Sequence, residues 1–194
     1  MKKGIIIILG IALILGFWGV PKYNNMVALQ EAVDAQWGQV QNVYQRRADL
    51  IPNLVNTVKG YKEFEQETLT RVAEARAMVG QIKLTSDDLK DPKLIKRFSE
   101  AQNQLSQTLS RLLSVSENYP DLKANESFNA LITELEGSEN RISVERKKFN
   151  DRAREYNTYI KKFPNSFFAN FGDFEKIEYF EGAQGIEQAP TVEF

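Results

Sequence analysis

The sequence predicts an all-α protein in which an N-terminal transmembrane helix precedes an up-and-down four-helix bundle and an aromatic, acidic C-terminal tail. Three observations predict this class. Residues 4–20 are uncharged and mostly aliphatic, apolar side chains then recur at every third or fourth position after residue 23, and no alternating strand pattern interrupts them. A chain of 194 residues can bury one proper core and is too short for two comfortable ones. We therefore divide it into a membrane anchor at residues 1–22, a bundle at 23–163, and a tail at 164–194 packed on the bundle.

The N-terminal run has the length and flanking residues of an uncleaved signal anchor. Seventeen uncharged, mostly aliphatic residues, Gly4 to Val20, follow two lysines and span about 26 Å as a helix, close to the thickness of a thin bilayer. The exit carries bulky aromatics and Pro21 instead of the small residues of a cleavage site. A cleaved signal peptide and a buried helix are the alternatives. The predicted anchor residues are Ile5, Ile8, Leu9, Ala12, Leu15, Gly16, and the interfacial pair Trp18 and Tyr23.

The charge asymmetry of the anchor predicts a cytoplasmic N-terminus. Lys2 and Lys3 precede the span, whereas Lys22 is the only cation in the twenty residues that follow it. Because the more positive side stays inside, we expect a single-pass membrane protein with its bundle outside. A stripe of small residues on one face of the anchor, together with confinement in one membrane, predicts a homo-oligomer. The stripe consists of Ala12, Gly16 and Gly19.

The first half of the predicted bundle has two helices, near residues 24–47 and 50–81. Apolar residues keep a helical period through both. Between them Asp49 can cap the second helix, and Pro52 lies in its first turn, where a missing N–H costs nothing. We favour two helices joined by a tight connection. One long helix kinked at Pro52 is the alternative.

The second half begins after a polar connection at residues 82–91. Asp91 followed by Pro92 is a start signal for a third helix, which ends near residues 118–120, before a proline. A fourth helix runs from about residue 122 or 125 to 162. Four amphipathic helices joined by short links bury their apolar stripes as a bundle with coiled-coil-like packing.

The tail is both aromatic and acidic. Eight of the chain's 21 aromatic residues lie between residues 163 and 194. The net charge of this segment is −5, and that of the preceding residues 141–162 is +5. We therefore expect the phenylalanines of residues 165–181 to pack on the bundle, with their acidic neighbours near the basic end of the fourth helix.

Composition excludes several classes of function. Twenty-five basic and 26 acidic residues give a net charge of −1, which removes the electrostatic basis for nucleic-acid binding. The chain has no histidine and no cysteine. It therefore lacks the usual general base, the thiolate nucleophile and the usual ligands of zinc and iron. We predict no catalytic residue, no metal site and no cofactor, and a protein that is not an enzyme.

Two groups of residues resemble the LemA family of bacterial membrane-anchored proteins. The first group is Arg46 to Val55 with Thr57 to Tyr61 and Glu74 to Ala77; the second is Glu145 to Lys147, Phe149-Asn150, Tyr156-Asn157 and the closing runs Glu178 to Phe180 and Pro190 to Phe194. The chain departs from the family at Gly172-Asp173-Phe174, where a Gly-Phe pair is usual. The resemblance implies a membrane helix, a four-helix bundle and two helices at Pro52. It implies no activity, substrate or cofactor.

These strings contain eight residues that we single out as buried structural groups or as parts of an interaction site. They are Arg46, Arg47, Asp49, Pro52, Asn53, Arg146, Asn150 and Asn157. The expected function is that of a membrane-tethered, non-enzymatic interaction or scaffold protein of the bacterial cell envelope, located in the cytoplasmic membrane. An envelope sensor that binds a small ligand or peptide through its bundle is the alternative.

Overall fold

All secondary structure in the described part of the chain is helical. The computed structural model describes residues 2–61 and 64–181, with side chains from residue 16 onward. Within these ranges lie six α-helices and one 3-10 turn, and no strand, as the predicted all-α class requires. They are α1 (Lys2–Lys59), α2 (Gln66–Gln81), the turn η1 (Asp87–Lys90), α3 (Pro92–Ser116), α4 (Pro120–Lys123), α5 (Glu126–Lys161) and α6 (Asn165–Phe171).

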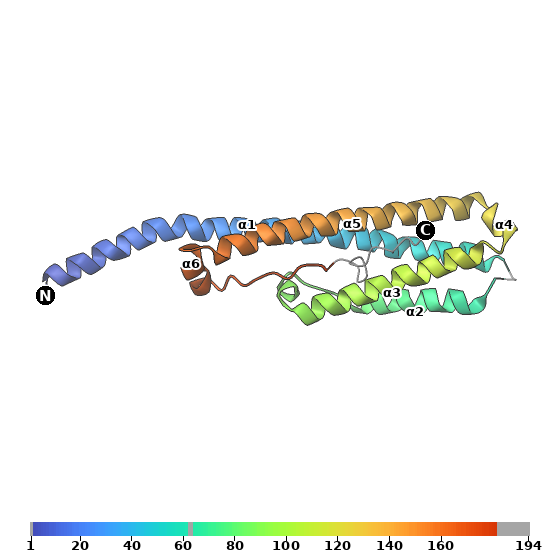
Figure 1. Cartoon of the computed structure of the whole chain (residues 1–194), viewed down its shortest axis with the longest axis horizontal. Helices are drawn as coiled ribbons and strands as arrows, with labels where there is room; N and C mark the ends of the chain where they lie inside the picture. Colours follow the sequence, from blue (N-terminus) through green and yellow to red (C-terminus); the bar gives the residue numbers. More distant parts are fainter. Residues whose placement is uncertain (1, 62–63, 182–194) are drawn as a thin grey trace, which may run out of the picture.

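The long helices form two antiparallel pairs in an elongated molecule (Figure 1). α1 packs along α5 and α2 packs along α3, while the pairs contact each other less extensively. α2 and α3 cover only the half of α1 toward Lys59; in the other half, α6 and the extended residues 172–181 take their place. The predicted up-and-down bundle of four mutually packed helices is therefore not confirmed.

α1 is one helix of 58 residues, about 87 Å long, that continues through Pro52. The prediction of two helices meeting at Asp49 and Pro52 is wrong, and the chain instead leaves the helix at Gly60, a poor helix former. Proline lacks an N–H, so it leaves the carbonyl of Ala48 without its helical partner. The Nε–H of Arg76 in α2 donates to that carbonyl at 3.0 Å. A long-range donor thus supports the helix at the proline.

The starts of α3 and α5 are set by side-chain caps. Asp91 Oδ1 accepts a hydrogen bond from the backbone N–H of Lys93 at 2.8 Å, which confirms the start predicted there. Asn125 Oδ1 accepts from the N–H of Phe128 at 3.0 Å, so α5 begins at the later of the two predicted positions. The short α4, which the sequence analysis does not predict, occupies the link between them.

Two hydrophobic clusters fill the interior. The proximal cluster, toward the N-terminal end of α1, centres on the aromatic rings of Trp37, Phe98, Phe149 and Phe180, whose contacting centroids lie 5.2 to 6.3 Å apart. The distal cluster is mostly aliphatic and is built from all four long helices. Because Phe180 belongs to the tail, the tail forms part of the proximal core.

The tail phenylalanines fall into two groups. Phe174 and Phe180 are buried, whereas Phe167 and Phe171 are 55% and 78% exposed. The expectation that the phenylalanines of residues 165–181 pack on the helices is therefore wrong for Phe167 and Phe171. Among the described residues, the tail carboxylates also do not pair with the basic end of α5, since Glu175 lies 3.9 Å from a lysine of η1.

The predicted anchor is helical as the first part of α1, but most of its side chains lie outside the described residues. They are Ile5, Ile8, Leu9, Ala12 and Leu15. Where side chains are described, no helix contains an apolar stretch that could cross a membrane. Trp18 and Tyr23 are exposed. Gly16 borders open space, but a Cβ at Gly19 would meet the ring of Phe168 at 2.8 Å. Gly19 is therefore covered by α6, which corrects its assignment to a free face for a second copy.

The contact between Arg76 and Ala48 predicts an energetic coupling with Pro52. Arg76→Met removes the donor and should destabilise the protein by about 1 kcal/mol, the usual net value of a hydrogen bond. In a Pro52→Ala background the alanine N–H can bond the Ala48 carbonyl within the helix, so the same change should cost little. Chemical unfolding of the four members of this double-mutant cycle measures the coupling. Equal costs in both backgrounds would show that Arg76 does not support the helix at Pro52.

Candidate functional site

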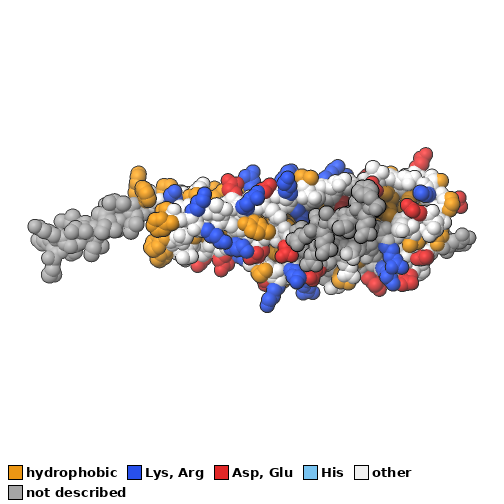
Figure 2. Space-filling model, in the orientation of Figure 1, with side chains coloured by type: hydrophobic (Ala, Val, Ile, Leu, Met, Phe, Trp, Pro, Cys, Tyr) orange, Lys and Arg blue, Asp and Glu red, His pale blue; other side chains and the backbone are white. Residues whose placement is uncertain are grey.

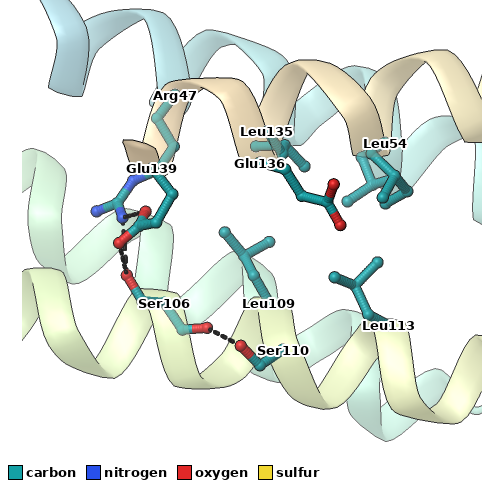
Figure 3. Close-up of a pocket in the computed structure, with 10 residues that line it drawn as sticks. Arg47, Leu54, Ser106, Leu109, Ser110, Leu113, Leu135, Glu136 and Glu139 are labelled. Carbon is teal, nitrogen blue, oxygen red and sulfur yellow. Dashed lines mark hydrogen bonds and ion pairs between the residues drawn. The ribbon is translucent and has the colours of Figure 1, made fainter. Parts of the chain in front are cut away.

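A layer of polar side chains separates the two hydrophobic clusters. Its centre is Arg47 of α1, which is only 2% exposed. The Nη1 of Arg47 donates to Glu139 Oε2 of α5 at 2.6 Å and to Ser106 Oγ of α3 at 2.8 Å (Figure 3). The Nη2 of Arg47 donates to Gln102 of α3. One guanidinium therefore joins three helices that are far apart in the sequence.

Three members of the layer, Arg47, Gln102 and Glu139, interrupt the apolar stripes of their helices. Arg47 lies three residues after Tyr44 and four before Ile51, where the stripe calls for an apolar side chain. Gln102 lies likewise between Phe98 and Leu105. Glu139 lies between Leu135 and Ile142. Because the three interruptions fall at one level, polar groups meet polar groups when the helices pack.

The electrostatics of the layer are those of a structural ion pair that is open on one side. The Arg47 side chain is buried, whereas that of Glu139 is 51% exposed. The ring of Tyr44 lies 5.4 Å from the guanidinium carbon of Arg47. Burial raises the pKa of the Tyr44 phenol, and the nearby Arg146 and Arg47 partly offset this rise. Tyr44 therefore stays neutral near pH 7 and contributes a ring face.

An apolar groove of about 120 Å³ opens beside the layer. Figure 3 shows leucines of three helices around it, with the pair of Arg47 and Glu139 at one end; the leucines are Leu54, Leu109, Leu113 and Leu135. Pockets for small molecules usually measure about 300 to 1,000 Å³. This groove holds about four water volumes, which suits one apolar side chain better than a metabolite.

A wider groove of about 590 Å³ lies between α3 and the tail. It reaches Ser106 and Glu139, so it adjoins the apolar groove. Charged side chains of both signs line it, among them Lys96, Glu100 and Glu178. Ligand pockets are predominantly apolar with a few placed polar groups, so this lining is more typical of a hydrated surface.

Two asparagines of α5 hold the tail by its backbone. Asn157 donates through Nδ2 to the carbonyl of Ile177 at 2.7 Å and accepts through Oδ1 from the Ile177 N–H at 2.9 Å. Asn150 makes the same pair of bonds with Phe180, at 2.8 and 2.9 Å. Each amide satisfies both backbone groups of one residue, as a neighbouring strand would. The tail is thereby fixed in one register along α5.

Arg146 completes this set of contacts to the tail. Its Nη2 donates to the carbonyl of Glu181 at 2.8 Å, and its guanidinium carbon lies 4.9 Å from the ring centre of Phe180. Arg146 and Asn150 are one helical turn apart, so they reach the same side of α5. Three of the residues singled out from the sequence therefore bind one segment.

The other residues singled out from the sequence belong neither to the polar layer around Arg47 nor to the contacts between α5 and the tail. Arg46 lies 3.8 Å from Glu134 with both side chains about half exposed. Asp49 accepts a hydrogen bond from Gln45 on the surface, and the side chain of Asn53 is exposed. Pro52 acts through the carbonyl of Ala48 that it leaves free.

Four residues that complete these contacts are not predicted from the sequence. They are Arg76, Gln102, Ser106 and Glu139. The interrupted stripes were a usable signal for Gln102 and Glu139, because an amide or a carboxylate at a stripe position requires a buried or half-buried partner. Arg76 lies within the family-like string, but nothing local identifies its acceptor.

Burial also raises the pKa values of two side chains near the proximal cluster, Asp34 and Tyr156. It raises the pKa of Asp34, against a hydrogen bond with Ser86, and it raises the pKa of Tyr156 to about 12, together with the charges of Asp34 and Glu175. Both shifts arise mainly from packing. In the part of the chain that the structure describes, no three acidic side chains are grouped as a metal site would need.

Comparison with known proteins identifies the relatives of this chain. A sequence model described as the LemA family matches residues 36–194, which confirms the resemblance drawn from the sequence. Magnetosome protein MamQ of Magnetospirillum gryphiswaldense is 26% identical over 175 residues, which is 82% of this chain and 64% of that protein. Magnetosome protein MamQ 2 of Paramagnetospirillum magneticum is 26% identical over 176 residues, covering 82% and 65%. Protein LemA of Metamycoplasma hominis is 24% identical over 165 residues, covering 85% and 71%.

The alignments differ in how much of each relative they cover. The chain spans less than two thirds of the two magnetosome proteins. It spans more of the LemA protein. Both groupings in this site, around Arg47 and around Asn150 and Asn157, fall inside the matched residues 36–194.

The polar layer predicts an asymmetry between its two charged members. Glu139→Ala leaves the buried Arg47 without its counter-ion and should cost about 3 kcal/mol, the lower end of the range for breaking a buried pair. Arg47→Met leaves a half-exposed carboxylate that water can solvate, and should cost about 1–2 kcal/mol for the unpaired Gln102. Chemical unfolding of the detergent-solubilised protein checks the order. A larger loss of stability for Arg47→Met than for Glu139→Ala would contradict the inference that the buried Arg47 needs its partner more than the half-exposed Glu139 does.

The asparagine contacts predict that replacing an asparagine of α5 by alanine destabilises the protein by an amount that depends on its position along the helix. Asn157→Ala strands both backbone groups of Ile177, which is buried, and should cost about 2–3 kcal/mol. Asn150→Ala should cost less because its site is only half buried. Asn140, an exposed asparagine of α5, is the matched control and should be nearly neutral on replacement by alanine. Thermal unfolding measures all three; a neutral Asn157→Ala would show that the tail is held by its apolar side chains alone.

Proposed function

The chain belongs to the LemA family, and from this premise we propose that it is a membrane-tethered, non-enzymatic interaction protein of the bacterial cell envelope. The proposal includes a single-pass anchor at residues 1–22 in the cytoplasmic membrane, with the helical body outside. It also includes the division into anchor, body at residues 23–163 and tail at 164–194. The chemistry of the site and the geometry of α1 support it.

The observation that carries the proposal is the continuity of α1. The helix runs without a break from the predicted anchor through the whole body. From residue 23 to residue 59 the helix is about 55 Å long. It therefore holds the body in a fixed orientation relative to the membrane, which a flexible linker would not do. An elongated body on a stiff stem presents its sides to neighbouring proteins. That arrangement suits a scaffold.

The polar residues of the family-like strings support the non-enzymatic part of the proposal. Arg47 donates hydrogen bonds to three partners, and Asn150 and Asn157 each make two hydrogen bonds with the tail backbone. Groups committed in this way hold the fold together. A catalytic acid or base has to be within reach of a substrate proton instead.

The alternative, a sensor for a small ligand, has weaker support. The apolar groove is smaller than pockets for small molecules, and the wider groove has a charged lining. Self-assembly belongs to the leading proposal as well. It would use a face of the anchor that includes Gly16, because Gly19 is covered by α6.

Topology labelling tests the tether and its orientation. The chain has no native cysteine, and Asp87 of η1 is 91% exposed, so Asp87→Cys is a clean reporter of the body. In intact spheroplasts an impermeant maleimide should label Asp87→Cys and should spare Lys3→Cys until the cells are lysed. The protein should stay in the pellet after carbonate washing. The reverse labelling would overturn the orientation, and release by carbonate would overturn the tether.

A further inference from the structure

Large exposed apolar side chains gather at one end of the molecule. Figure 2 shows hydrophobic side chains clustered where α1 leaves the body. We call this set the aromatic collar: Phe17, Trp18 and Tyr23 of α1, with Phe163, Phe167 and Phe171 in and just before α6. Phe163 is 89% exposed and Trp18 is 63% exposed. Such a concentration of exposed rings on a folded protein marks an interaction surface.

Two collar residues share one face of α6. Phe167 and Phe171 lie one helical turn apart with ring centroids 5.0 Å apart, and Phe163, in the turn before α6, is exposed as well. Asn165 and Ala169, on the other side of the helix, are buried against the body. α6 therefore turns Asn165, Ala169 and the partly buried Phe168 toward the body, and Phe167 and Phe171 outward.

The position of α6 along α1 is set by close packing. The ring of Phe168 covers Gly19, and Gly172 lies against the ring of Tyr23. Tyr23 also meets Phe174 edge-on, with ring centroids 5.2 Å apart. These contacts place α6 beside residues 19–23 of α1, which is where the predicted anchor leaves the bilayer.

We propose that the aromatic collar lies in the boundary between headgroups and acyl chains of the bilayer that holds the anchor. This inference rests on the proposed membrane tether. Aromatic rings favour that boundary, and a short helix with one apolar face lies in its plane. Exposed Lys161 and Lys162 stand at the same end, where they meet anionic headgroups. The collar lies where α1 leaves the body, so it faces the membrane whatever protein binds the body.

The acidic character of the tail does not oppose this placement. Asp173 is the tail carboxylate next to α6. Glu175, Glu178 and Glu181 follow Phe174 on the stretch that runs back along α5, since Ile177 is bound at Asn157 and Phe180 at Asn150. Those two asparagines are about 10 Å apart along the helix. The carboxylates therefore lie progressively farther from the membrane end.

Spin-label depth measurements test the collar in the intact protein. Single cysteines replace Phe167 or Phe171, and the labelled full-length chain is reconstituted in vesicles of phosphatidylethanolamine and phosphatidylglycerol. Val144→Cys, half exposed in the middle of α5, is the matched aqueous control, and Ile8→Cys reports the anchor. Labels at 167 and 171 should collide more often with oxygen than with an aqueous nickel complex, and the label at 144 should show the opposite preference.

The anchor label separates failure of the collar from failure of the tether. Nickel accessibility at 167 and 171 equal to that at 144, with residue 8 in the bilayer core, would overturn the collar and leave the tether intact. Nickel accessibility at residue 8 as well would overturn the tether and the collar with it. Because Phe167 and Phe171 are exposed, their replacement should leave the melting temperature in detergent unchanged, which excludes misfolding as the cause of either result.

Discussion

The relative placement of the long helices depends on the hydrogen bonds that the buried guanidinium of Arg47 makes with α3 and α5. Apolar surfaces attract without direction, so the stripes of α1, α3 and α5 could be buried after a slide of one turn. Such a slide of about 5.4 Å would set Arg47 and Gln102 against hydrocarbon side chains and leave both unpaired. The cost of an unpaired buried charge is several times that of a rearranged apolar contact. The layer thus fixes which level of each helix meets the others and where the proximal cluster gives way to the distal one.

At two other places the backbone has hydrogen-bonding groups that no neighbouring backbone group pairs, and a side chain pairs them instead. At Pro52 the freed carbonyl of Ala48 takes a donor from Arg76, which lets α1 continue as a single stem. Along α5, Asn150 and Asn157 supply both bonds for residues of an extended tail that has no strand beside it. In each case a side chain from a distant part of the sequence makes the hydrogen bond that a backbone N–H or C=O group needs.

These contacts connect the body to the end of the molecule where α6 packs on α1. The tail fixed on α5 leads directly from α6, so the position of α6 depends on the asparagines as well as on the packing of Phe168 over Gly19. α1 passes both the polar layer and α6 without a break. Movement of α6 relative to α1 would therefore disturb both the tail contacts on α5 and the packing of Phe168 over Gly19.

The sequence by itself determined the helical class, the cap at Asp91, the family and the absence of His and Cys side chains, because these follow from local periodicity, local hydrogen bonds and composition. It also singled out Arg47, Asn150 and Asn157. Only the tertiary structure decided their partners, since Gln102 lies 55 residues and Glu139 lies 92 residues from Arg47. It also decided that α1 continues through Pro52, because the donor that replaces the lost bond is 28 residues away. The division of the tail between buried Phe174 and exposed Phe171 had the same origin: identical side chains differ only in which surface the fold leaves open to them.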